Sequence, residues 1–152
     1  MTLLRHTVAT LAYRANKALR GAPPEFSSFH LAAPQTPGQI LSHLCDLLDW
    51  ALTSADGATK WHTSTPGEWD QDVARFYASL EAFDRRLAAP EPIACEPEKL
   101  FQGPIADALT HVGQLAMLRR LAGHKIPGEN YYVASISVGR CGPDQATPVR
   151  EF

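Results

Sequence analysis

Hydrophobic residues recur along most of the chain at intervals of three and four positions, the spacing that places side chains on one face of an α-helix. The pattern predicts a first helix over residues 2–19, which the Gly-Ala-Pro-Pro sequence at 21–24 ends. A second helix is predicted over 36–55, because a threonine suited to the N-cap is followed there by a proline. The loop between them contains Phe26 and other apolar residues, so we expect it to pack against the helices.

Two further helices follow from the same spacing. One is predicted over residues 67–88 and ends ahead of two prolines, and the other is predicted over 97–122. Gly123 has the position of a left-handed cap at the end of the fourth helix. Long helices joined by moderate loops favour the all-α class and an antiparallel four-helix bundle, with residues 1–152 in a single domain.

The last part of the chain, residues 124–152, loses the helical spacing. Residues 131–138 are rich in aromatic and β-branched side chains, which predicts a short extended segment. The glycines and proline that follow break regular structure. We expect an extended C-terminal tail that lies across the bundle or across a partner subunit.

Composition indicates an ordinary soluble domain. The chain has 152 residues, of which 45% are hydrophobic and 20% charged, so it can bury a core and lies far from the disordered range. The formal net charge of −2 and the lack of a basic, aromatic-rich stripe argue against nucleic-acid binding. No apolar run is long enough to cross a membrane, so we expect no membrane association.

Cysteine usage and the N-terminal sequence indicate the compartment. Cys45, Cys95 and Cys141 are an odd number, are widely spaced and form no CxxC motif, which favours a reducing cytoplasm. Four cations precede the first acid, Glu25, which could mimic an organelle transit peptide. A basic face on the first helix is the favoured interpretation, and we expect a cytoplasmic protein.

Polar residues interrupt the apolar face of two predicted helices. Asp107, His111 and Gln114 are separated by four and three positions in the fourth helix, so their side chains project from one face. His43 falls within the apolar stripe of the second helix and is expected to point inward. Polar groups on such faces cost free energy unless they have partners. Metal sites in helix bundles are built from pairs of this kind on facing helices.

His43, Asp107 and His111 together therefore predict a divalent-metal site inside the bundle. Two imidazoles and a carboxylate suit zinc, nickel, iron or manganese and leave coordination positions open. Each signal alone is weak, because such acid–histidine pairs usually lie on solvated faces and a lone inward histidine is more often a core residue. Gln114 could bind a substrate or a ligand carboxylate. Asp46, one turn after His43, could orient an imidazole from behind, although a helix-surface acid is the more ordinary interpretation.

Other aromatic and histidine residues carry weaker signals. Trp50, Trp61 and Trp69 are attributed to core or loop packing. The remaining histidines lack a partner at a suitable spacing and are assigned surface or loop roles by default; they are His6, His30, His62 and His124.

Two segments resemble the DinB/YfiT-like superfamily of four-helix bundles. One is residues 107–114, Asp-Ala-Leu-Thr-His-Val-Gly-Gln, with the segment 115–123 that follows, and the other is residues 36–43. The similarity covers the chain to about residue 136, and its most specific element is the His-x-x-Gln sequence at His111. The resemblance implies a bundle that is usually dimeric and often holds a divalent metal on three histidines. Asp107 stands where the usual third histidine of the family falls.

The resemblance also implies an activity. Some relatives transfer thiols or use a low-molecular-weight thiol in isomerisation, so we expect a metal-dependent thiol transferase that acts on a small electrophile. In this hypothesis His43, Asp107 and His111 hold the metal, and Gln114 positions the substrate. Metal-dependent hydrolysis is a variant of it. The alternative is a non-catalytic, dimeric bundle that binds a small ligand or has a stress-related role, with the polar row purely structural.

Overall fold

The computed structural model describes residues 1–31 and 35–152. Within these residues, every secondary-structure element longer than a single bridge is a helix. The expectation of an all-α protein is confirmed. In chain order the elements are α1 (Thr2–Leu19), η1 (Pro24–Ser28), α2 (Pro37–Ala55), α3 (Trp69–Ala88), α4 (Pro97–Leu100), η2 (Phe101–Ile105), α5 (Ala106–Leu121) and η3 (Tyr131–Val133).

Groups at the helix ends explain most of the boundaries. The hydroxyl of Thr36 accepts a hydrogen bond from the backbone of Gln39, whose side chain accepts one from Thr36 in return, so α2 begins as its sequence predicts. Gly123 has a φ of +84° and follows Ala122, the C-cap residue of α5, which confirms the expected left-handed position. Helix α3 begins two residues later than expected, because the N–H of Gly67 donates to the carboxylate of Asp72 instead of a helical carbonyl.

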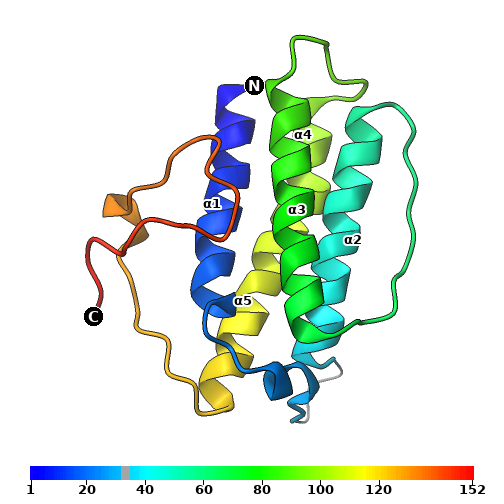
Figure 1. The fold of residues 1–152 in the computed structure, drawn as a ribbon. Helices are drawn as coiled ribbons and strands as arrows, with labels where there is room; N and C mark the ends of the chain where they lie inside the picture. Colours follow the sequence, from blue (N-terminus) through cyan, green and yellow to red (C-terminus); the bar gives the residue numbers. More distant parts are fainter. Residues whose placement is uncertain (32–34) are drawn as a thin grey trace.

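The helix expected over residues 97–122 contains an irregular turn. Short helix α4 continues into η2, a π-type turn that contains Pro104, and then into α5. Proline lacks an N–H and its ring clashes with the carbonyl four residues earlier, so the regular α-helical ladder cannot pass through it. The wider turn absorbs this defect, and the three elements keep one common direction (Figure 1).

The apolar faces of α1, α2, α3 and α5 meet in one core. Leu11, Leu44, Phe76 and Leu115, one from each of these helices, are fully buried. Segment η1 adds Phe26, which packs edge-to-face on a tryptophan at the start of α3. The loop after α1 thus packs on the helices as expected, apart from its residues 32–34, which lie outside the described part of the chain.

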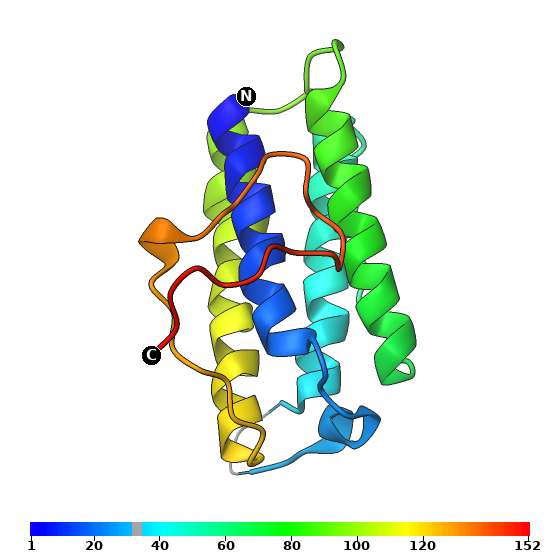
Figure 2. The ribbon, with the colours of Figure 1, turned by 60° about the vertical axis from the view of Figure 1, so that its left-hand side comes forward.

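Helices α2 and α3 lie side by side and run in the same direction (Figures 1 and 2). Side-chain contacts agree, because Arg75 binds Asp49 near the middle of α2, and Arg86 binds Asp56 at its end. The expected antiparallel arrangement is therefore wrong for this pair. The connection over residues 56–68 returns along the helices, and extended chain, at about 3.3 Å per residue, is long enough to span a helix of about 28 Å.

Helix α2 has a different neighbour on its other side. It packs against α5, and a second contact pair joins α1 to α3. In that second pair Arg5 binds Asp84, while Asn16 near the other end of α1 binds Tyr77, so α1 and α3 run in opposite directions. The long connection over residues 56–68 runs along the outer side of α2, which neither α3 nor α5 covers (Figure 1).

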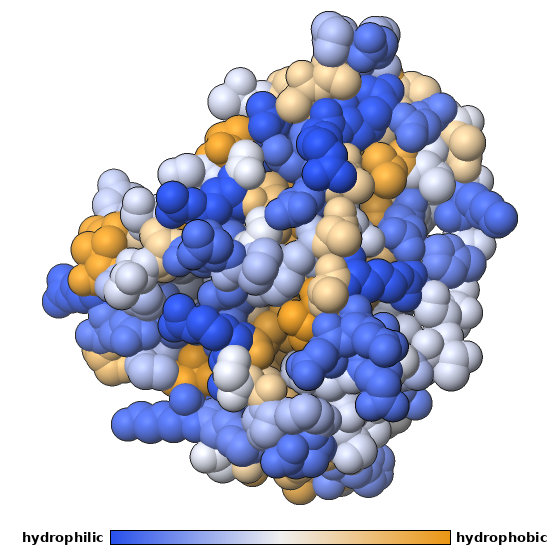
Figure 3. Space-filling model, viewed as in Figure 1, coloured by the Kyte–Doolittle hydropathy of each residue, from blue (hydrophilic) through white to orange (hydrophobic). Residues whose placement is uncertain are grey.

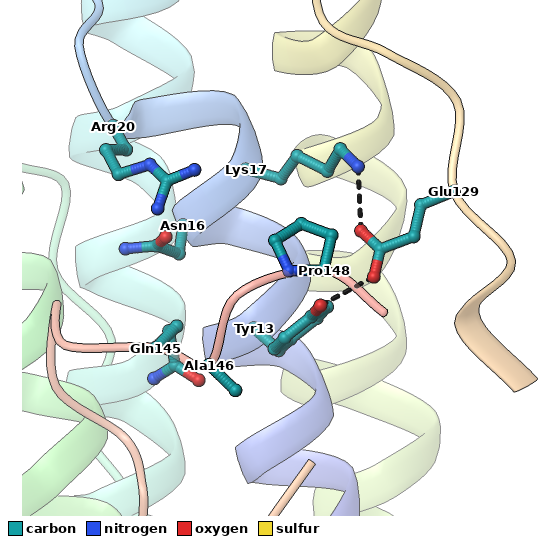
Figure 4. A pocket seen from close by; sticks show the side chains of 8 residues that line it. All are labelled: Tyr13, Asn16, Lys17, Arg20, Glu129, Gln145, Ala146 and Pro148. Atoms are coloured by element: carbon teal, nitrogen blue, oxygen red, sulfur yellow. Dashed lines mark hydrogen bonds and ion pairs between the residues drawn. The ribbon is translucent and has the colours of Figure 1, made fainter. Parts of the chain in front are cut away.

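The C-terminal tail crosses α1 in both ribbon views (Figures 1 and 2). One attachment is the carboxylate of Glu129, whose side chain is completely buried, and another is Cys141, which is buried in the core. Tyr13 and Lys17 of α1 both point at this carboxylate and donate hydrogen bonds to it (Figure 4). In the hollow drawn there, between α1 and residues 145–148, Lys17 and Glu129 thus already pair with each other.

The extended segment expected over residues 131–138 is not formed. Tyr131–Val133 is a short 3-10 turn, because the side chain of Asn130 accepts a hydrogen bond from the backbone N–H two residues later. Strand-like pairing in the tail is limited to an antiparallel bridge between Glu129 and Glu151.

Polar side chains cover most of the face that carries α3 and the tail, and apolar groups on it are small and separate (Figure 3). Among the helices described here, none combines the length and the apolar character that crossing a bilayer requires.

Candidate metal centre

His43 on α2 meets Asp107 and His111 on α5 where the two helices pack. One donor atom from each residue lies within 4.8 Å of the other two. The Nε2 atom of His43 is 3.6 Å from Oδ2 of Asp107, and Nε2 of His111 is 3.5 Å from Oδ1. Two ligands of a tetrahedral ion with bonds of about 2.1 Å lie about 3.4 Å apart. Both nitrogen–oxygen distances are close to this value, and each involves a different oxygen of the Asp107 carboxylate.

The three side chains lie at the edge of the helix pair and not inside the bundle. The exposed fraction of the side chain is 14% for His111, 29% for His43 and 48% for Asp107. The expected inward orientation is thus wrong in degree, because the residues of α5 that enter the core are the next ones along, Ala108 and Val112. A cation held here would keep part of its coordination shell accessible from solvent.

Gln114 fixes the orientation of one imidazole. Its Oε1 atom lies 2.7 Å from Nδ1 of His111. An amide oxygen can only accept a hydrogen bond, so this contact favours a proton on Nδ1 and leaves Nε2, on the side of Asp107, to bind a cation. Histidines that bind metals are commonly held in this way through the other ring nitrogen. Gln114 was expected to contact a substrate or a ligand carboxylate, and the structure places it against the ring of His111.

Aromatic rings continue from the histidine pair toward the loop between α2 and α3. The rings of His43 and His111 are 4.8 Å apart and nearly perpendicular. Trp61 of the loop lies edge-to-face at 5.6 Å from His43, and its other neighbour is Trp50, at 5.8 Å. From the sequence, packing was favoured over a binding role for both tryptophans, and no spacing in it places them beside the candidate centre.

A second group of possible ligands consists of Asp46, Asp49 and His62. Its centre is filled by a cation of the protein, because one guanidinium nitrogen of Arg75 lies 2.8 Å from Asp46, 2.7 Å from Asp49 and 3.3 Å from the ring nitrogen of His62. We therefore interpret this group as an ion-pair cluster. The sequence did not predict this cluster, because its acids lie on α2, its histidine in the following loop and its arginine on α3. An acidic pair spaced i, i+3 on α2 was its one sequence signal.

Asp46 is a buried residue that holds the loop, not the surface acid favoured from the sequence. Its side chain is 1% exposed and accepts hydrogen bonds from the backbone N–H and the hydroxyl of Ser64, at 2.8 and 2.7 Å, as well as from Arg75. Burial acts to raise the pKa of Asp46, but these hydrogen bonds outweigh it and hold the pKa below its ordinary value. Its partners are thus the loop and α3, whereas the sequence suggested that it could orient His43.

The side of His43 that faces the loop opens into a hollow. It is lined by Gln35, Gln39, His43, Asp46, Thr63, Ser64 and Pro66. A ligand of the candidate centre could reach His43 from this direction.

His43, Asp107 and His111 form the more open of the two groups of possible ligands found in the described residues. Searches against protein-family models, curated proteins and solved structures found no match for this chain. The chemistry of the site is therefore judged from its donor atoms and their surroundings.

Proposed function

We propose that this protein is a metal-binding member of the DinB/YfiT-like superfamily of four-helix bundles, with one divalent cation held by His43, Asp107 and His111. The observation that carries the proposal is the approach of three donors from two helices to the distances that one cation requires. The sequence resemblance over residues 36–43 and 107–123 is a second support. Zinc, nickel, iron and manganese all suit this donor set.

Thiol transfer to a small electrophile is the proposed activity. A divalent cation bound at this site would supply Lewis acidity that favours the deprotonated form of a thiol at neutral pH. The sulfur would then form a bond to the electrophilic carbon as the bond from that carbon to its leaving group breaks, and the thiol proton would pass to solvent or to the leaving group. Asp107 contributes a negative charge beside the two imidazoles, and Gln114 keeps the Nε2 lone pair of His111 directed at the site.

The thiol itself would have to come from a ligand. Cys45 and Cys141 are buried, and burial raises the pKa of both thiols to about 12, so they stay protonated at neutral pH. Burial also raises the pKa of Cys95, which follows Ala94 at the C-terminal end of α2, away from His43. The Cys45 thiol also contacts the backbone of α3 and not the candidate centre. We therefore propose a low-molecular-weight thiol as a partner of the site.

Two other functions are compatible with the same residues. In the first, the cation activates water and the protein is a hydrolase. In the second, the protein is a non-catalytic, dimeric bundle that binds a small ligand. Turnover of a small electrophile with some member of a panel of thiols would favour transfer, and turnover without any thiol would favour hydrolysis. Light scattering on the purified protein tests the proposed homodimer.

Metal content tests the proposal directly. The purified protein is reconstituted with zinc, nickel, iron or manganese, desalted and measured by plasma mass spectrometry. We expect close to one equivalent of one of these metals per chain. His43→Ala and Asp107→Ala each remove a donor and should lower bound metal to below a tenth of that amount.

His6→Ala is the matched control, because His6 is an exposed histidine on α1 outside the site. It should retain the full metal content. Absence of metal in the reconstituted native protein, or equal loss from all three variants, would contradict the proposal.

A further inference from the structure

The loop over residues 56–68 places one tryptophan beside the candidate centre. Trp61 lies edge-to-face against His43, so it borders the ligand set on the loop side. It remains 45% exposed even though it also contacts Trp50. An indole that is nearly half exposed contributes less to folding than a buried one, and its free surface is available to a ligand.

The orientation of Trp61 is fixed from both sides. Its indole N–H donates to the hydroxyl of Thr63 at 3.2 Å. Before it in the chain, the backbone N–H of Lys60 contacts the hydroxyl of Thr53 on α2, and after it Ser64 is bound to Asp46. The ring is thus held at the site before any ligand arrives, which lowers the entropic cost of stacking a ligand on it.

The charge of a metal-loaded site limits which ligands could bind beside Trp61. Tryptophan faces attract both cations and other aromatic rings. A divalent cation with two neutral imidazoles and one carboxylate leaves a net positive site, which would repel a cationic ligand. Arg75 binds both nearby acids, Asp46 and Asp49, and offsets one of their two negative charges. The positive site and the remaining negative charge would together be close to neutral, which favours a neutral ligand.

We infer that Trp61 forms an aromatic recognition wall, and that the site prefers a neutral ligand with an aromatic ring next to the group that binds the cation. This inference rests on the proposed function, because the ligand is anchored through the cation. Aromatic pairs in offset or edge-to-face arrangements add about threefold to tenfold in affinity beyond the area that they bury.

Binding of two matched thiols to the cobalt(II)-loaded protein tests the inference. Benzyl mercaptan carries an aromatic ring, and cyclohexylmethyl mercaptan carries a saturated ring of similar size on the same reactive group. Titration of each, followed by the thiolate-to-cobalt absorption, gives two dissociation constants. We expect the aromatic thiol to bind about threefold to tenfold more tightly. Trp61→Leu should reduce this ratio to about one, and Trp61→Phe should keep most of it.

Tyr132→Leu is the matched control, because Tyr132 is an aromatic residue on the tail that is 97% exposed. It should leave the ratio unchanged, and none of the variants should alter cobalt affinity by more than about threefold. Cobalt binding with equal thiol affinities in the native protein, or an aromatic preference that survives Trp61→Leu, would overturn the inference alone. Failure of the native protein to bind cobalt or any of the four proposed metals would overturn the proposed function and this inference with it.

Discussion

At the scale of single residues, Gln114 controls the part of His111 that faces the site. Its amide oxygen accepts the Nδ1 proton and leaves Nε2 free to bind a cation. Gln114→Leu has a similar size but cannot accept this hydrogen bond. We expect metal affinity to fall about 10-fold to 100-fold, as for other groups that orient a ligand from behind. Competition with a chromophoric chelator measures the affinity.

Gln102→Leu provides the comparison for Gln114→Leu, because Gln102 is an exposed glutamine in the π-type turn that precedes α5. It should change metal affinity by less than about twofold. An unchanged affinity in Gln114→Leu would show that the hydrogen bond to His111 does not prepare the site.

At the scale of elements, the parallel course of α2 and α3 explains why the loop reaches the candidate centre. A hairpin between antiparallel helices would have left the side of α2 uncovered. The return of residues 56–68 along the helices instead brings Trp61 to His43 and Ser64 to Asp46. The hydrogen bonds of Asp46 are thus the main link between this loop and the helices.

Asp46→Asn tests that link. Loss of the carboxylate weakens charge-assisted hydrogen bonds to Arg75 and Ser64, so we expect the free energy of unfolding at pH 7 to fall by about 2 kcal/mol. The pKa of Asp46 is lowered in the folded protein from 3.8. Its stabilising contribution is therefore complete above that value and is lost as the pH falls through the folded pKa. Urea unfolding followed by circular dichroism from pH 2 to 7 should show native and variant stabilities converging below pH 3.8.

Asp70→Asn serves as the reference for this measurement, because Asp70 is an exposed acid in the first turn of α3. Its effect should stay within about 0.5 kcal/mol at pH 7. A stability gap for Asp46→Asn that persists unchanged down to pH 2 would contradict the assigned role of the carboxylate.

At the scale of the whole molecule, local signals predicted the helices well, and packing decided what they could not. The capping sequence at Thr36 and the glycine at 123 act within one helical turn, so the sequence alone indicates them. The spacing of Asp107 and His111 likewise placed both on one face. Helix direction depends on how a loop lies on the core, and the loop length over residues 56–68 allowed either direction.

The parts of the site that the sequence missed depend on contacts between distant segments. His62 has no partner at a helical spacing, and it meets Asp46 and Asp49 only because the loop runs along α2. The sequence also could not predict how deeply the polar residues of the candidate centre are buried. A row of polar residues at the border of an apolar face can lie inside a bundle or at its edge, and Asp107 lies at the edge.

One buried charge, Glu129, helps to hold the C-terminal tail to the bundle. Glu129 binds both Lys17 and Tyr13, and burial together with this hydrogen bond raises the pKa of Tyr13. The side chain of Lys17 is only 10% exposed, so it would be poorly solvated without its partner. Glu129→Gln should therefore lower the free energy of unfolding by about 3 kcal/mol and release the tail while α1 to α5 stay helical.

Limited proteolysis with mass spectrometry, together with urea unfolding, measures both effects of Glu129→Gln. Cleavage within residues 130–152 should become at least about tenfold faster, because a segment that opens more often is cut more often. Glu151→Gln is the natural comparison, since Glu151 also binds Lys17 but its side chain is 41% exposed. An exposed ion pair contributes less than about 1 kcal/mol, so this variant should stay close to the native protein. Equal behaviour of the two variants would mean that burial of Glu129 is not what holds the tail against α1.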